Sequence, residues 1–278
     1  MTPAKTRIPV AVLGATGSVG QRFIQLLQRH PWFRLHTVTA SPRSSGRKYG
    51  DAVNWMQADP LPASVADLVV RDTTPDAVKD CPLVFSALGR ETADGLEAEI
   101  ASAGQVIVSN ASAYRMHPEV PLLVPEVNPE HLDLLQQQSF GNGRLLTNPN
   151  CSTIGLTLAL KPLLDAFGLE AVHVVTLQAV SGAGIPGVSS YSILDNVIPY
   201  IGGEEEKLEE ETGKILGRVT PAGIQAHPMT VSATCNRVAV VDGHTECVSV
   251  KLRDRATEAD IRAAWSDFRS APQELDLP

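Results

Sequence analysis

The 278-residue sequence lacks several features that would assign it to a specialised class of protein. It has only four cysteines, Cys81, Cys151, Cys235 and Cys247, and none has the CxxC spacing typical of a metal or redox site. We therefore expect free thiols in a reducing compartment and no bound metal. No apolar run approaches the roughly eighteen residues needed to cross a membrane, and the first predicted strand begins too close to Met1 for a signal peptide. These absences predict a cytoplasmic protein.

Positive charge is also scarce, because the net charge is −8. This balance argues against nucleic acid as the main partner, and it means that an anionic ligand would need locally placed cations. The contents of 43% hydrophobic and 19% charged residues are those of an ordinary globular protein. The chain is long enough to form two domains.

The sequence does contain a cysteine at a predicted helix start. An apolar strand, Leu145–Thr147, ends at Asn148-Pro149-Asn150, Cys151 follows, and a helical pattern begins with Ile154. Unpaired N–H groups and the helix dipole favour a thiolate at such a position. The alternative is a buried structural cysteine. We favour a reactive thiol.

A glycine-rich turn follows the first predicted strand, Ile8–Leu13, and begins a helix from Ser18 to about Arg29. Its glycines, Gly14, Gly17 and Gly20, permit a tight turn and a close approach of the backbone to a pyrophosphate. The GxxGxxG spacing is a variant of the dinucleotide-binding fingerprint, and a plain strand–helix turn is the alternative. Because the strand and the helix are both legible, we interpret the turn as a cofactor site.

The end of the second predicted strand, Leu35–Ala40, indicates which cofactor binds. NAD sites usually carry an acidic residue there, whereas this chain has Ser41, Arg43 and Ser44. A guanidinium flanked by hydroxyls suits a 2′-phosphate, so the sequence favours NADP. The alternative is a solvated basic loop formed by Arg43, Arg47 and Lys48.

Strands and helices continue to alternate through the first half. Further strands are predicted at Leu68–Val70, Leu83–Ser86 and Val106–Ser109, and helices at Thr92–Ala103 and Pro129–Gln138. This order predicts an α/β fold with a Rossmann-type, doubly wound parallel sheet. Ser86 and Ala87 lie at the end of one strand, at the edge where such sheets bind ligands. Arg115 follows the next strand, and a surface position is an equal alternative for it.

The second half has a different pattern. The helix after Cys151 is expected to kink or break at Pro162. A strand from Val172 to Val180, a loop and a helix from Glu204 to about Leu216 follow, and we expect most glutamates of that helix to be solvated. Strands Thr230–Val241 and Thr245–Leu252 are joined by Asp242-Gly243, which predicts a hairpin that brings Arg237 near His244. A surface histidine at the hairpin end is the alternative for His244. A helix from Thr257 to Phe268 is the last predicted element.

Taken together, these stretches resemble the aspartate-semialdehyde dehydrogenase family, in particular its archaeal and fungal branch. The resemblance covers essentially the whole chain and depends on six motifs in one order. They are GATGSVG at 14–20, ASPRSSG at 40–46, SNASAYRM at 109–116, NPNCST at 148–153, GEEEK at 203–207 and NRVAVVDGHTE at 236–246.

The resemblance implies a role for individual residues. Cys151 is expected to be the nucleophile, His244 the acid/base and Gln178 the residue that orients the acyl intermediate. Residues expected to bind the substrate or phosphate are Arg237, Glu204, Asn150, Arg115 and Lys207. Residues expected to bind NADP(H) are Gly14, Ala15, Thr16, Gly17, Ser18, Val19, Gly20, Ser41, Arg43, Ser44, Ser86, Ala87 and Gly182. The implied reaction is the NADPH-dependent conversion of aspartyl phosphate to aspartate semialdehyde through a cysteine thioester.

The resemblance also implies a domain organisation. We expect an NADP-binding domain at 1–150 and a second α+β domain for catalysis and dimerisation at 151–278, in a homodimer or homotetramer. The family continues into a further strand and a long helix, so we expect the second domain to be incomplete at Pro278. Alternatives are a related malonyl-CoA reductase, a more distant N-acetylglutamyl-phosphate reductase, and a protein that binds NADP without catalysis.

Overall fold

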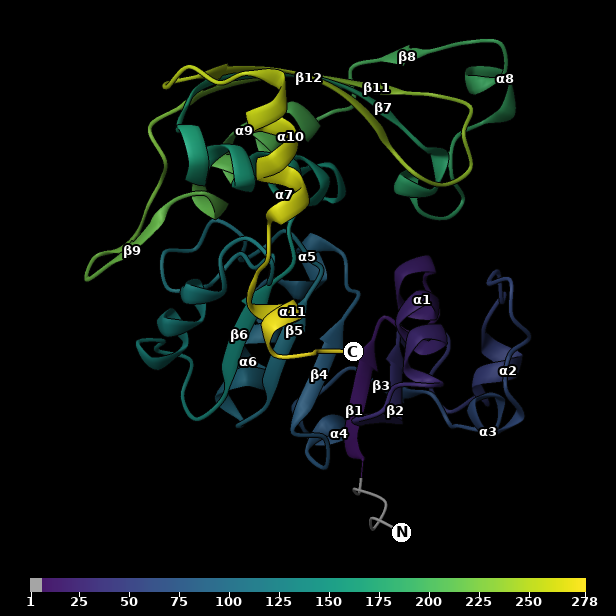
Figure 1. Cartoon of the computed structure of the whole chain (residues 1–278). Helices are drawn as coiled ribbons and strands as arrows, with labels where there is room; N and C mark the ends of the chain where they lie inside the picture. The colour runs from purple at the N-terminus through teal and green to yellow at the C-terminus, as the bar shows by residue number, and fades with distance from the viewer. Residues whose placement is uncertain (1–6) are drawn as a thin grey trace, which may run out of the picture. The chain divides into compact units, whose positions relative to one another are not determined.

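The computed structural model describes residues 7–278 and divides them into two compact units (Figure 1). The first unit contains the described residues up to Pro121, together with Leu135–Asn148 and Pro278, and the second contains Leu122–Leu134 and Pro149–Leu277. The expected division at 150/151 differs from this mainly in the segment Leu122–Leu134, and also at Pro149, Asn150 and Pro278. That segment belongs to the second unit because Leu122, Val124 and Val127 are buried in its hydrophobic core.

A six-stranded parallel sheet forms the centre of the first unit, with the strand order β3-β2-β1-β4-β5-β6. Residues Val10–Leu13 of β1 are fully buried, because the sheet is covered on both faces. This strand order confirms the predicted Rossmann-type fold. The strands are β1 Ile8–Leu13, β2 Phe33–Ala40, β3 Arg71–Asp72, β4 Leu83–Ser86, β5 Val106–Ser109 and β6 Arg144–Thr147.

Short helices connect these strands, and two predictions in this region are corrected. The single helix predicted at Thr92–Ala103 is divided by Gly95, whose φ of +78° lies outside the helical region. The predicted strand Leu68–Val70 contributes only an isolated bridge at Val69, and the strand itself lies further along the chain. The helices are α1 Ser18–Leu27, α2 Tyr49–Ala52, α3 Ala63–Ala66, α4 Pro75–Val78, α5 Arg90–Ala93 and α6 Leu96–Ser102. The helix predicted at Pro129–Gln138 is the 3-10 helix η1, Pro129–Gln136.

The second unit combines a long buried helix with a mixed sheet of order β12-β7-β11-β8. Helix α7 passes through Pro162 without ending there, because Leu156, Leu160 and Leu163 are buried in the core on both sides of the proline. The elements are α7 Cys151–Phe167, β7 Leu169–Gln178, η2 Val180–Ala183, α8 Ser190–Ile193, β8 Ile198–Pro199, α9 Glu204–Ile215, β9 Arg218–Thr220, β10 Gly223–Gln225, β11 Thr230–Arg237, β12 Thr245–Leu252, α10 Glu258–Asp267 and α11 Ala271–Glu274.

The predicted hairpin between β11 and β12 is wrong. Strand β7 lies between them, paired in parallel with β11 and antiparallel with β12. Strand β11 ends at Arg237, so the following residues form a connection that passes the end of β7. Val238 N donates to Gln178 O, and Val180 N donates to Val240 O. The separation of seven residues between Arg237 and His244 thus spans a neighbouring strand rather than a tight turn.

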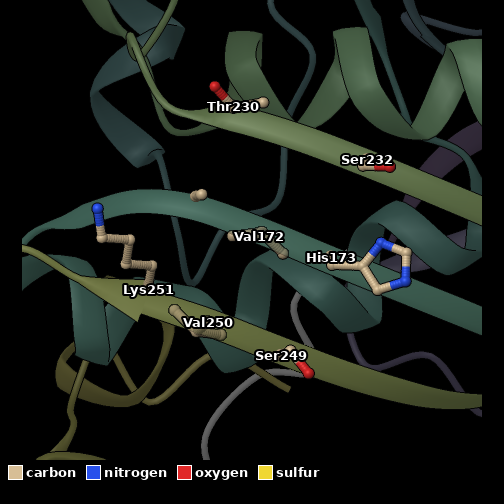
Figure 2. Close-up of a pocket in the computed structure, with 8 residues that line it drawn as sticks. Val172, His173, Thr230, Ser232, Ser249, Val250 and Lys251 are labelled. Atoms are coloured by element: carbon tan, nitrogen blue, oxygen red, sulfur yellow. The ribbon is translucent and has the colours of Figure 1, made fainter.

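The two faces of this mixed sheet differ in polarity. Val174 and Cys235 face the core of the second unit. The opposite face carries polar side chains from β7, β11 and β12, among them His173, Ser232 and Ser249 (Figure 2), and it has a hollow there. The residues that line it are Ala171, Val172, His173, Thr230, Ser232, Ser249, Val250 and Lys251. The hollow contains none of the predicted site residues.

No helix within residues 7–278 is long and apolar enough to cross a membrane.

Candidate active site

The start of helix α7 presents the thiol of Cys151. Asn150 is the N-cap residue, and its side chain accepts a hydrogen bond from Ser152 N at 2.9 Å. Cys151 is the first residue of the helix and is exposed, whereas Cys81 and Cys235 are fully buried. A buried structural role, the alternative for Cys151, is therefore excluded by its exposure. The thiol lies where the helix dipole stabilises a negative charge.

An imidazole lies beside this thiol. Nε2 of His244 is 3.0 Å from Sγ of Cys151, and Nδ1 accepts a hydrogen bond from Ala179 N at 3.0 Å. Burial is the main cause that lowers the pKa of His244, the Arg237 guanidinium lowers it further, and Glu204 and Asp242 act in the opposite direction. The ring is consequently neutral near pH 7.

Arg237 is held close to the same histidine. This last residue of β11 is only 7% exposed, and its Nη1 donates to Ala179 O at 2.8 Å. The two backbone groups of Ala179 thus bind Arg237 and His244. Gly182 lies against both side chains, since a Cβ at that position would be 2.8 Å from Nη1 of Arg237. Arg237 and His244 therefore lie close together, as the predicted hairpin implied. The cause is different, because both side chains bind the backbone of Ala179 at the end of β7.

Glu204 connects the remaining predicted residues of the second unit. Its Oε2 accepts from Asn150 Nδ2 at 2.7 Å and from Gln178 Nε2 at 3.3 Å, while Lys207 Nζ lies 2.8 Å from Oε1. Burial is the largest single effect on the pKa of Glu204, and it acts to raise the pKa. The contacts with Lys207, Asn150 and Gln178 together outweigh burial, so the pKa of Glu204 is lowered. Glu204 is therefore an ionised carboxylate at neutral pH.

The glutamates of α9 are more involved in structure than their charge run predicted. Glu205 and Glu209 accept hydrogen bonds from Cys235 N and Ala233 N, which are backbone donors of β11. Glu211 is 2% exposed and accepts from Asn150 N at 2.6 Å. The expectation that most of these glutamates are solvated is wrong, because β8 is too short to pair with the whole of β11 and α9 carboxylates take its place.

Sequence reasoning missed three groups that hold the predicted residues in position. They are Glu211, the backbone of Ala179, and Ser152, whose Oγ accepts from Gln178 Nε2 at 2.6 Å. Glu211 lies seven positions after Glu204, a helical spacing that would have placed both on one face of α9. No local pattern marks Ala179 or Ser152.

The first unit contains the glycine-rich turn. A Cβ on Gly14, whose φ is +67°, would lie 2.6 Å from Ala87 O, and one on Gly20 would lie 2.3 Å from Gly14 O. The turn therefore packs backbone against backbone and has no room for side chains at these positions. Ala15 O accepts a hydrogen bond from the buried hydroxyl of Tyr49 at 2.7 Å, and this bond helps to hold the turn in place.

The other first-unit residues of the prediction surround the ends of the strands. Ser41 and Arg43 are exposed after β2, Ser44 is half-buried, and Ser86 is fully buried at the end of β4. Arg115 is only 8% exposed, and its Nη2 donates to Asn110 O at 2.9 Å, so the surface alternative for this residue is wrong. Thr16, Ser18 and Val19 lie in or next to the first turn of α1, which contains no acidic residue.

The two units thus hold different parts of the predicted site. Cys151, His244, Gln178, Arg237 and Glu204 lie together in the second unit, along with Asn150, Lys207 and Gly182. The glycine-rich turn, Ser41, Arg43, Ser44, Ser86, Ala87 and Arg115 lie in the first. Residues 7–278 contain no cluster of side chains suited to a metal ion. Chemically, the second unit can supply a thiolate nucleophile next to a neutral imidazole, with a cation and a carboxylate for a zwitterionic substrate.

Two family models and several relatives match this chain. The family model of the semialdehyde dehydrogenase NAD-binding domain matches residues 9–135, and that of the dimerisation domain matches residues 160–275. The aspartate-semialdehyde dehydrogenase of Methanothermobacter thermautotrophicus is 52% identical over 97% of this chain and 78% of its own length. The Saccharomyces cerevisiae enzyme of the same name is 51% identical over 88% of this chain and 71% of its own.

A solved structure extends the similarity to three dimensions. The crystal structure of Candida albicans aspartate-semialdehyde dehydrogenase with NADP aligns with a TM-score of 0.91 at 44% identity. The alignment covers 98% of this chain and 79% of the Candida chain.

Proposed function

Since the chain belongs to the aspartate-semialdehyde dehydrogenase family, we propose that Cys151, His244 and Gln178 are the catalytic residues with which it carries out that family's reaction. The reaction is the NADPH-dependent reductive dephosphorylation of aspartyl phosphate to aspartate semialdehyde, which serves the biosynthesis of lysine, threonine and methionine. The observation that carries the assignment of residues is the distance of 3.0 Å between Cys151 Sγ and His244 Nε2.

Cys151 is the nucleophile of this proposal. Its sulfur adds to the carbonyl carbon of the acyl phosphate, the C–O bond to phosphate breaks, and phosphate leaves with the electron pair, which yields a thioester on Cys151. The exposure of Cys151 at the start of α7 supports the role, because the sulfur is accessible and a thiolate is favoured there. Gln178, held by Ser152 and Glu204, is positioned to orient the acyl group.

Arg237 and Glu204 bind the amino-acid part of the substrate. A guanidinium binds a carboxylate through two parallel hydrogen bonds, which a lysine cannot reproduce. Arg237 is fixed by Ala179 O and keeps further N–H groups for this purpose. The ionised Glu204 provides the complementary charge for the α-ammonium group, and Asn150 holds its Oε2 in place.

Lys207 and Arg115 are the proposed phosphate ligands. Lys207 is half-exposed and its pairing with Glu204 leaves two of its three N–H donors for an anion. Arg115 belongs to the first unit and is nearly buried. These local cations are needed because the chain as a whole is acidic.

NADP(H) binds at the glycine-rich turn of the first unit. The backbone-to-backbone packing at Gly14 and Gly20 is the arrangement that lets a pyrophosphate approach the start of α1, and Thr16, Ser18 and Val19 supply N–H groups there. Gly17, whose N–H donates to Gly14 O at 3.1 Å, contributes the absence of a side chain. Ser41, Arg43 and Ser44 bind the 2′-phosphate, and Ala15, Ser86, Ala87 and Gly182 complete the proposed set. When bound, the cofactor supplies the hydride that reduces the thioester.

The family model of the dimerisation domain indicates a dimer. We propose that the chain forms a homodimer, and a homotetramer is the alternative. Light scattering measures the mass of the assembly and distinguishes the two. A cytoplasmic location also stays a prediction.

The test is an assay of NADP reduction with aspartate semialdehyde, with and without phosphate. The proposal predicts steady turnover that depends on phosphate, because phosphate must release the acyl group from Cys151. Turnover that does not depend on phosphate would contradict an acyl-phosphate product and favour an acyl-CoA reductase. An assay of NADPH oxidation with malonyl-CoA as the substrate would test that alternative directly. Quenching of NADPH fluorescence without turnover would support a protein that binds the cofactor but does not catalyse.

A further inference from the structure

Helix α9 holds the start of α7 through two carboxylates. Glu204 and Glu211 lie seven positions apart in the sequence and so on one face of α9. Oε2 of Glu204 accepts from the side-chain Nδ2 of Asn150 at 2.7 Å, and Oε2 of Glu211 accepts from the backbone N of Asn150 at 2.6 Å. We propose that Glu211 is a positioning residue of the reaction, which fixes Asn150 and thereby holds the thiol of Cys151 against His244.

All four polar atoms of Asn150 take part in hydrogen bonds. Besides its two nitrogens, Oδ1 accepts from Ser152 N at 2.9 Å and the backbone O accepts from Ile154 N at 3.1 Å. The residue before it, Pro149, has no N–H with which to anchor the chain. The carboxylates of α9 therefore fix the N-cap residue of α7, and the N-cap residue fixes Cys151, which follows it directly.

The two carboxylates differ in their access to ligands. Glu211 is 2% exposed, whereas the side chain of Glu204 is 14% exposed and is proposed to bind the α-ammonium group of the substrate. The substrate would therefore compete with Asn150 for Glu204 but would not reach Glu211. Glu211 is then the anchor that stays in place throughout the catalytic cycle, a conclusion that rests on the proposed function.

Lys214 balances the charge of this buried carboxylate. It lies three positions after Glu211 on α9, so the two side chains are neighbours on the helix, and it is only 5% exposed. Burial lowers the pKa of Lys214 to about 8, while the charge of Glu211 acts to raise it. The ammonium group is thus still mostly protonated at pH 7. An unbalanced anion beside the start of α7 would disfavour the thiolate of Cys151, and the pairing with Lys214 avoids this.

The test uses double variants, because removal of Glu211 alone would leave the buried Lys214 ammonium without that carboxylate. Both variants carry Lys214→Met, and they differ only in Glu211→Gln or Glu211→Met. The amide oxygen of glutamine can accept from Asn150 N, whereas methionine has a similar length and no oxygen. Glu210→Met, at an exposed position of the same helix, is the control for the loss of a negative charge.

We expect the methionine double variant to lose about 10²-fold in kcat, as for a misplacement of the reacting group by about 1 Å. The KM for aspartate semialdehyde should change less than kcat, because Arg237 and Glu204 are still present. The glutamine double variant should recover most of the lost kcat, and Glu210→Met should have the kcat of the unaltered protein. Equal kcat values in the two double variants would overturn the proposal.

A second measurement does not need turnover. Alkylation of Cys151 by iodoacetamide, followed at a series of pH values by mass spectrometry of its peptide, reports the thiolate fraction. We expect the midpoint to move to higher pH in the methionine double variant and to return towards that of the unaltered protein in the glutamine one. A purely structural role of Glu211 would lower the thermal midpoint and leave this profile unchanged, which would also overturn the proposal.

Two outcomes in the unaltered protein separate this proposal from the proposed function. Absence of phosphate-dependent turnover would overturn the proposed function, while the alkylation profiles would still test the link between Glu211 and Cys151. The amide of Asn150 should be protected from hydrogen exchange, because a buried carboxylate binds it. Rapid exchange of this amide would overturn the role of Glu211 even if a variant failed to fold.

Discussion

The two units of this protein build their sites by opposite means. In the first unit, the glycine-rich turn depends on missing side chains, because Gly14 and Gly20 allow backbone atoms to approach one another directly. In the second, the thiol and imidazole depend on side chains that hold one another, with Glu204 and Ala179 as the points of attachment. It follows that the first site should be most sensitive to added atoms and the second to removed ones.

The largest effect is expected from Cys151→Ala in the second unit. Loss of the nucleophile should lower turnover by roughly 10⁴-fold or more and abolish labelling by a substrate-like electrophile. NADPH affinity should be nearly unchanged, because its proposed binding residues lie mostly in the first unit. Labelling and fluorescence titration measure the two quantities. Cys247→Ala, which removes the other exposed thiol, should leave both intact; persistent labelling of the Cys151 variant would contradict the assignment.

Gly20→Ala tests the first unit by adding one methyl group. The new Cβ would lie 2.3 Å from Gly14 O, a backbone atom that cannot move aside easily. We expect a cost on the order of 3 kcal/mol, seen as a lower thermal midpoint and weak NADPH binding. The matched control is Gly89→Ala, where a Cβ would meet nothing within 4 Å. Equal behaviour of the two variants would show that the close packing is unimportant.

Glu204→Gln removes one charge from the centre of the second network. The contacts with Lys207, Asn150 and Gln178 all involve its carboxylate, so we expect kcat/KM to fall by about 10- to 100-fold, the loss of charge-assisted hydrogen bonds. Glu206→Gln, two positions along the same helix but exposed, is the control. If both variants retained full activity, Glu204 would have no role in binding the substrate.

Arg43→Ala tests the selectivity of the first unit between cofactors. An exposed charge-assisted contact with the 2′-phosphate should make the loss about tenfold for NADPH. NADH lacks that phosphate, so its affinity should not change. Fluorescence titration with each cofactor measures the difference, and equal losses would refute the role.

The smallest effect concerns the pH dependence of stability in the second unit. Burial raises the pKa of Glu246 to about 7 from 4.5. Between these values the folded protein keeps a proton that the unfolded chain releases, so the contribution of Glu246 is complete below pH 4.5 and is lost as the pH rises through 7. We expect a fall on the order of 1 kcal/mol, allowing for residual contact with water.

Urea unfolding at a series of pH values measures this contribution. Glu246→Gln should flatten the curve between pH 5 and 7, whereas Glu206→Gln should not change its shape. A curve that keeps its slope in the Glu246 variant would mean that other groups cause it.

The same contrast explains what the sequence could predict. The first unit was predictable because its signals are local: an apolar strand, three glycines and a helix follow one another within residues 8–27, and the parallel sheet follows from their repetition. The break between the short helices at Gly95 could not be predicted, because the residues around it have a helical pattern and only the positive φ of Gly95 interrupts the helix.

In the second unit, the roles of Cys151 and His244 came from the family resemblance, while their proximity depends on strand order. The Asp242-Gly243 pair indicated a hairpin, but β7 takes the place between β11 and β12 and brings Ala179 against both Arg237 and His244. The buried position of Glu211 was hidden within a run of charges that usually marks a solvated helix face.

The most direct test of the account is to trap the acyl group on the second unit. The protein is mixed with aspartate semialdehyde and NADP⁺ in the absence of phosphate, and NADPH formation is followed by stopped flow while peptides are examined by mass spectrometry. The account predicts a single burst of NADPH that does not exceed the amount of protein, together with an acyl adduct on the peptide containing Cys151. Addition of phosphate should then remove the adduct and restart turnover. Absence of the adduct, or an adduct on Cys247 instead, would contradict it.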